Sequence, residues 1–156
     1  MFESNMEADS KKPILDEATA EFLRKKGSLE ILVEIGSEGP RRHTDLREEL
    51  LLSSSTVQKR LKKGKEHDLW EPTIETREGV DAKVHQLTDL GEALYSYAAD
   101  EELPKLYAGR RGLIRSIEKR ERKVLIEMAP DDADWTSDIP MEKYEIDLAQ
   151  KFLSQF

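Results

Sequence analysis

Apolar residues recur three and four positions apart along most of the chain, which is the spacing of helices with one buried face. The first such helix is predicted to begin at a cap on Asp16 and to end at Gly27. The next segment, 28–37, has an apolar run that would also suit a buried strand, but two glutamates four positions apart favour a helix capped by Ser28. Residues 16–37 are therefore predicted to form two helices.

Turn and capping residues divide the next part of the chain into two further helices. Gly39 and Pro40 predict a turn. Thr44 is a suitable cap for a helix over residues 45–51, and any serine of the triplet 53–55 can cap a helix that runs to about His67.

The pattern becomes extended after this fourth helix. Residues 71–87 are predicted to form a hairpin with its tip near Gly79, and alternation through residues 84–87 predicts a second strand with one buried face. Thr88 is predicted to cap another helix. Further on, a charged helix is expected over residues 104–128, and a last amphipathic helix is expected near Pro140.

The charge is unevenly distributed along the chain. The protein has 156 residues and a formal net charge of −8, which by itself argues against non-specific binding to nucleic acid. However, residues 40–70 carry eight Lys and Arg side chains against five Asp and Glu, as do residues 101–128. The basic segment 40–70 covers the third and fourth predicted helices, and we expect a binding partner to contact this segment.

Several classes of site are excluded or disfavoured. With no cysteine, the chain forms no disulfide or thiolate site, and its three histidines fall on separate elements without metal-ligand spacing. The serine triplet lacks the nucleophile-elbow motif, and neither a P-loop nor a dinucleotide-binding glycine motif is present. We therefore expect no enzyme activity, no metal and no cofactor. The polar first residues and the lack of a long apolar run favour a cytoplasmic protein.

Three stretches carry a resemblance to a known family. SEGPRRHTDLREEL, LSSSTVQKRLKKGKEHDLWEP and KVHQLTDLGEAL follow one another between residues 28 and 99. In this order they resemble archaeal and bacterial winged helix-turn-helix transcriptional regulators of the MarR/HxlR type. The resemblance implies a mainly α fold with a small β-hairpin (α+β), in which flanking helices serve dimerisation.

The implied organisation has three parts. Residues 1–13 are predicted to be a disordered arm, residues 14–100 a winged helix-turn-helix domain, and residues 101–156 a helical extension for dimerisation. The chain departs from the family at Gly64, where a large apolar residue is usual, and we expect Trp70 to fill the space that this glycine leaves. It also lacks the cysteine typical of the HxlR subgroup, so thiol sensing is excluded.

The fourth predicted helix has two chemically distinct sides. With Val57 at zero and 100° per residue, Leu61 and Gly64 lie within about 40° of it, while a polar set lies roughly opposite. Hydroxyls and amides at a helix start suit phosphate oxygens, a glutamine amide can read adenine, and lysines can reach guanine or phosphate. The predicted DNA-binding residues are Arg41, Arg42, Ser54, Ser55, Thr56, Gln58, Lys59, Lys62, Lys63 and, in the wing, Arg77.

Two functions remain open from the sequence. The first is a sequence-specific double-stranded DNA-binding regulator that acts as a homodimer, with the recognition helix at about 54–67 in the major groove and the wing at about 71–87. The second is a winged-helix protein-interaction module in a transcription or chromatin assembly, which the net acidity favours. Apolar side chains of the outer helices are expected to form the dimer interface: Phe22, Ile114, Ile117, Val124, Tyr144, Leu148 and Phe152. A small-molecule effector is neither demanded nor excluded.

Overall fold

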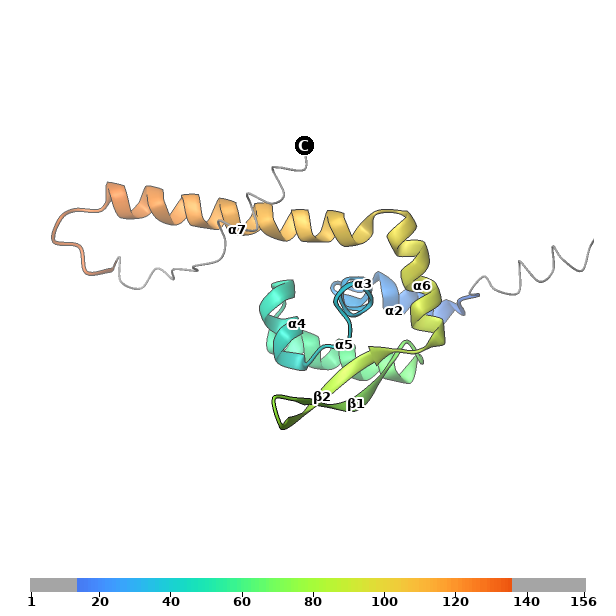
Figure 1. Cartoon of the computed structure of the whole chain (residues 1–156). Coiled ribbons are helices and arrows are strands. Elements are labelled where there is room, and N and C mark those ends of the chain that lie inside the picture. Colours follow the sequence, from blue (N-terminus) through green and yellow to red (C-terminus); the bar gives the residue numbers. More distant parts are fainter. Residues whose placement is uncertain (1–13, 136–156) are drawn as a thin grey trace, which may run out of the picture. The chain divides into compact units, whose positions relative to one another are not determined.

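The computed structural model describes residues 14–135 and divides the chain into two compact units, Met1–Pro104 and Lys105–Phe156. Figure 1 shows the order of the elements. In the first unit they are α2 (Glu17–Arg24), α3 (Ser28–Glu38), α4 (His43–Leu50), α5 (Ser54–Glu66), β1 (Trp70–Arg77), β2 (Val80–Leu87) and α6 (Asp89–Asp100). The second unit contains α7 (Leu103–Met128), which begins just before the boundary. The predicted helix at Pro140 lies outside the described residues.

The two strands form an antiparallel hairpin. Trp70 pairs with Leu87 at its open end and Arg77 pairs with Val80 next to the turn. The two turn residues, Glu78 and Gly79, both have positive φ (52° and 77°), as the twist of a tight hairpin requires.

A third extended segment joins the hairpin between α3 and α4. The Arg41 N–H donates to the His85 carbonyl at 3.1 Å, and the His85 N–H donates to the Arg41 carbonyl at 2.7 Å. This pairing differs from the alternation predicted for residues 84–87. Val84 and His85 are both buried, although they are neighbours in the strand, and His85 is the residue that pairs with Arg41.

The core of this unit lies between α3, α4, α5 and the hairpin. Ile31, Leu46, Val57 and Val84 are completely buried. Trp70 is 1% exposed, and its indole Nε1 donates to the Leu61 carbonyl of α5 at 2.9 Å. Burying apolar side chains from all these elements together stabilises their mutual arrangement. The first strand is thereby anchored to α5.

Gly64 and Trp70 are matched to each other as expected. Gly64 is buried on α5, and a Cβ atom at this position would overlap the Trp70 indole ring. The ring therefore occupies the space that the missing side chain leaves, and Trp70 can approach the helix backbone closely.

The helix starts differ in two places from the prediction. Asp16, Ser53 and Thr88 act as caps through their side chains, on α2, α5 and α6 respectively. Ser28 is not a cap, because the left-handed Gly27 (φ 88°) makes the turn and Ser28 is already helical. Thr44 is not a cap either. Helix α4 begins two residues earlier than predicted, at His43, and the Asp45 carboxylate accepts the Arg42 N–H at 2.9 Å.

This arrangement is a winged helix-turn-helix. Helices α3, α4 and α5 are followed by a hairpin wing that lies beside α5, as Figure 1 shows. The predicted fold class, mainly α with a small hairpin, is confirmed, and residues 28–38 are a helix rather than a strand. Among residues 14–135, no helix combines the length and apolar content that crossing a membrane would need.

Candidate nucleic-acid interface

Helix α5 presents the polar face that its sequence predicts. Val57, Leu61 and Gly64 are buried, whereas the opposite side lies open to solvent. The open residues among those predicted to bind DNA are Ser54, Ser55, Gln58, Lys59, Lys62 and Lys63, with Thr56 half-buried. We call the set Ser54, Ser55, Gln58, Lys59 and Lys62 the α5 face. The α5 face combines hydroxyl, amide and ammonium groups along one side of the helix.

The start of the α5 face is built by the serine triplet. Ser53 is the cap, since its Oγ accepts the Thr56 N–H at 3.1 Å and donates to the Thr56 hydroxyl at 2.8 Å. Ser54 and Ser55 therefore fall in the first turn, where the positive end of the helix dipole lies. Their position favours an anionic partner such as a DNA phosphate.

The lysines of the face differ in their pairing. Lys63 forms an ion pair with Glu66 at 3.2 Å. Within residues 14–135, no carboxylate lies within ion-pair distance of Lys59 or Lys62. Their charges are therefore available to an external anion, and Lys63 is partly neutralised.

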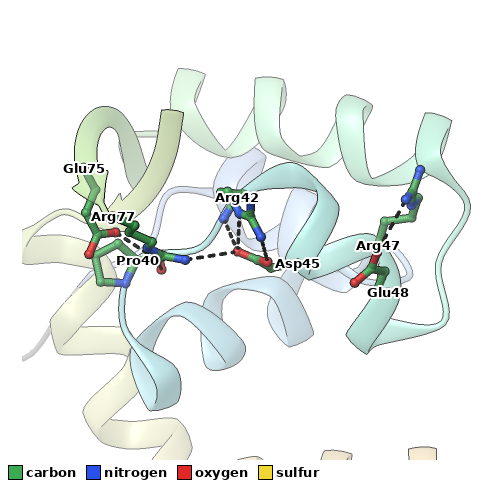
Figure 2. Close-up of polar contacts among 7 residues, drawn as sticks. All are labelled: Pro40, Arg42, Asp45, Arg47, Glu48, Glu75 and Arg77. Atoms are coloured by element: carbon green, nitrogen blue, oxygen red, sulfur yellow. Dashed lines mark hydrogen bonds and ion pairs between the residues drawn. The ribbon is translucent and has the colours of Figure 1, made fainter. Parts of the chain in front are cut away.

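Two of the predicted arginines meet at one carboxylate (Figure 2). Arg42 binds Asp45 through its Nε at 3.2 Å and its Nη2 at 2.9 Å. Arg77 lies 3.8 Å from the same carboxylate, and its Nη2 donates to Glu75 at 2.9 Å and to the Pro40 carbonyl at 3.2 Å. The hydrogen bonds from Arg42 lower the pKa of Asp45 and raise that of Arg42. This cluster thus has two positive and two negative side chains.

The arginine cluster alters the role expected of the wing. Arg77 was predicted to bind DNA from the wing. In the structure it is the last residue of β1, and its side chain folds back onto the chain before α4. Its contacts tie the wing to the start of α4. Arg41 is also held, since its backbone pairs with His85 and its side chain, 27% exposed, lies 3.7 Å from Glu38.

One residue beside the α5 face was not predicted. His43 begins α4, and its Nε2 lies 3.1 Å from the Ser54 carbonyl at the start of α5. Eleven positions separate the two residues, so neither helical spacing nor a motif connects them. The sequence offered only a histidine at the start of the helix that precedes the polar triplet.

Buried His85 makes the stability of the fold depend on pH. Burial, followed by the charges of Lys83, His43 and Lys65, lowers its pKa from 6.5 to about 4. The unfolded chain therefore binds a proton first as the pH falls below 6.5, and the folded state loses stability between about pH 6.5 and pH 4. The loss should be on the order of 3 kcal/mol at pH 4, at about 1.4 kcal/mol per pKa unit.

Urea unfolding of the parent and of His85→Gln at pH 7 and pH 4.5 tests this expectation. The parent should weaken over this range and His85→Gln should remain nearly constant. Asp16 and Asp45 also have lowered pKa values, but their contributions are lost only below their ordinary value of 3.8. An equal slope in both proteins would contradict the role of His85.

The residues predicted for the dimer interface fall into three groups. Ile114, Ile117 and Val124 are exposed on α7 by 37%, 57% and 61%. Phe22 is only 4% exposed, because its ring stacks on His67 and meets the edge of Trp70. It is a core residue of the first unit, so the prediction for Phe22 is wrong. Tyr144, Leu148 and Phe152 lie outside the described residues.

Comparison with known proteins gives structural neighbours only. No family model and no curated protein matches the chain. The reduced form of the transcriptional regulator YodB from B. subtilis is 20% identical, covers 56% of this chain and 84% of its own, and has a TM-score of 0.46. A MarR protein from Peptoclostridium difficile is 14% identical over 99% of this chain and 90% of its own, with a TM-score of 0.46.

A third neighbour is the adhesin competence repressor AdcR from Streptococcus pyogenes. It is 17% identical over 100% of this chain and 95% of its own, with a TM-score of 0.40. Of these three solved structures, one is of a transcriptional regulator, one is of a MarR protein and one is of a repressor. At identities of 14–20% residue roles cannot be transferred, so the function has to be inferred from this chain's own side chains.

Proposed function

We propose that this protein is a sequence-specific DNA-binding transcriptional regulator whose α5 helix enters the major groove. The observation that carries the proposal is the α5 face, which is open to solvent while Val57 and Leu61 hold the other side of the helix in the core. A major groove about 12 Å wide admits one helix. The regulator would act by occupying promoter DNA rather than by catalysis.

The polar residues divide into two roles in this proposal. Gln58 projects an amide that can pair with adenine, and Lys59 and Lys62 can contact guanine or phosphate. Ser54 and Ser55 lie at the helix start, where backbone phosphates are favoured. The arginine cluster contributes by holding the wing in place, because its charges are balanced by Asp45 and Glu75.

We further propose that the regulator is a homodimer formed through α7. This helix exposes several large apolar side chains besides those predicted, among them Leu106 (54%) and Leu125 (51%). Apolar side chains on one long helix are a common dimerisation surface, and two recognition helices would then read two half-sites about one DNA turn apart. Light scattering at micromolar concentration should give twice the chain mass of 18.0 kDa. A single 18.0 kDa species would contradict the dimer.

Selection of bound fragments from random double-stranded DNA tests the main proposal. The purified protein should enrich one motif, and footprinting should show protection of that motif. The protein-interaction module is the second candidate, favoured by Trp135, which is 44% exposed in a chain of net charge −8. Enrichment of no motif, together with one stoichiometric protein partner, would support the second candidate instead.

A further inference from the structure

A basic pocket lies between α5 and the wing. Its volume is about 390 Å³, and its polar lining consists of His43, Gln58, Lys62, Lys65, Lys83 and His85. These residues come from the start of α4, from α5 and from β2. The sequence separates the two histidines by more than 40 positions, and only the folded chain brings them to one place.

The pocket concentrates positive charge in an acidic protein. It is lined by three lysines and two histidines and by no aspartate or glutamate, although the whole chain has a net charge of −8. Among residues 14–135, none of these three lysines forms an ion pair with a carboxylate. Cations that share a concave site without a counter-charge repel one another, and an anion placed between them would relieve this repulsion.

His85 gives a second, independent indication of a ligand. Its side chain is 9% exposed and lines the pocket, yet its Nδ1 has no hydrogen-bond partner in the described structure. Buried polar atoms are nearly always hydrogen-bonded, so an orphaned one next to a cavity points to a group that is bound there. The ligand expected from such surroundings is one with negatively charged oxygen atoms.

The pocket opens on the same side of the domain as the α5 face. Gln58 and Lys62 belong to both the pocket and the α5 face. A DNA duplex with α5 in its major groove would therefore lie next to the opening of the pocket. Between a helix in the major groove and a wing beside it lies the sugar-phosphate backbone. Pockets of about 300–1,000 Å³ hold small ligands, so this one has room for a phosphate group and the sugar atoms next to it.

We infer that the pocket between α5 and the wing binds a phosphate group, supplied by the backbone of the bound DNA. This inference rests on the proposed function for the source of the phosphate, but not for the existence of the site. In this proposal Lys62, Lys65 and Lys83 surround the phosphate, and His43 and His85 line the pocket beside it. Leu61 and Pro72 complete the lining.

Lys83→Ala tests the pocket independently of the α5 face, because Lys83 lies on β2, outside that face, and is exposed. In a salt titration of binding to the selected DNA, this variant should bind about tenfold more weakly. Its plot of log affinity against log salt concentration should be shallower by about one unit, the effect of one lost phosphate contact. Lys65→Ala should act in the same way. Lys25→Ala, an exposed lysine at the end of α2, is the matched control and should bind like the parent.

A second measurement examines the pocket without DNA. Inorganic phosphate is added to the parent and to Lys83→Ala while the ring signals of His43 and His85 are followed by NMR. The parent signals should shift and saturate at millimolar phosphate, and those of Lys83→Ala should shift far less. Sodium chloride at matched ionic strength controls for general screening.

The outcomes distinguish the inference from the proposed function. If the parent binds DNA and both lysine variants bind it with unchanged affinity and salt slope, the DNA phosphate is not in this pocket and the inference is overturned. If the parent binds no DNA, the proposed function fails, and histidine shifts with phosphate would then show a site for a free phosphate compound. Absence of those shifts would overturn the pocket itself.

Discussion

Replacing Gly64 with alanine should lower the free energy of unfolding by about 2 kcal/mol. A Cβ at this position overlaps the Trp70 indole ring, which is 1% exposed and therefore has no free space into which it can move. Overpacking of a filled core costs about 1–3 kcal/mol or more, whereas the gain in helix propensity from glycine to alanine is only about 1 kcal/mol. Displacing the ring also strains the 2.9 Å hydrogen bond from Trp70 to the Leu61 carbonyl.

Urea denaturation of Gly64→Ala and of a neighbouring control measures this effect. Lys62→Ala lies two positions away on the exposed side and should change stability by less than about 0.5 kcal/mol. In a Trp70→Phe background, Gly64→Ala should cost clearly less, because the smaller ring leaves room. An unchanged cost in that background would show that the clash with Trp70 is not the cause. The result bears on function, since this contact anchors the wing to α5.

The double variant Lys59→Ala/Lys62→Ala should weaken binding to the selected DNA about 100-fold at low salt. Both side chains are exposed on the α5 face, and neither forms an ion pair within residues 14–135. Each phosphate contact contributes a slope of about −0.9 in log affinity against log salt concentration. Removing two contacts should therefore flatten the plot by about two units, and stability should be nearly unchanged because neither side chain is packed.

Titrations at several salt concentrations provide the measurement. Lys25→Ala/Lys26→Ala removes the same charge from the exposed connection between α2 and α3, so it controls for net charge alone. If the control loses as much affinity as the α5 variant, binding follows overall charge and has no defined face. If neither variant changes affinity or slope, α5 is not the recognition helix.

Much of the fold could be predicted because its signals are local. The spacing of Val57, Leu61 and Gly64 on α5 depends only on 3.6 residues per turn, and it correctly divided this helix into a buried and an open side. The match between Gly64 and Trp70 was also predictable, because a missing side chain on a buried face has to be filled by a neighbour. The starts of α3 and α4 were less certain, since several polar residues compete for one cap.

The candidate site was predicted only in part, because half of it depends on distant contacts. The exposed residues of α5 follow from the periodicity of a single helix. The ion pair between Arg77 and Asp45, by contrast, joins a strand to a helix residue 32 positions earlier in the sequence. No periodic pattern contains such a pairing. For the same reason Phe22 was assigned to a dimer surface, although its partners His67 and Trp70 lie more than 40 positions away.

The sequence by itself determined the order of helices and hairpin, the two sides of α5, and the absence of thiol chemistry, because each depends on residue type and near-neighbour spacing. Tertiary structure alone decided that Arg42 and Arg77 share one carboxylate and that His43, Lys83 and His85 line one pocket. The physical reason is that charge balance and desolvation depend on distance in space. That distance is settled only when the buried apolar faces have packed together.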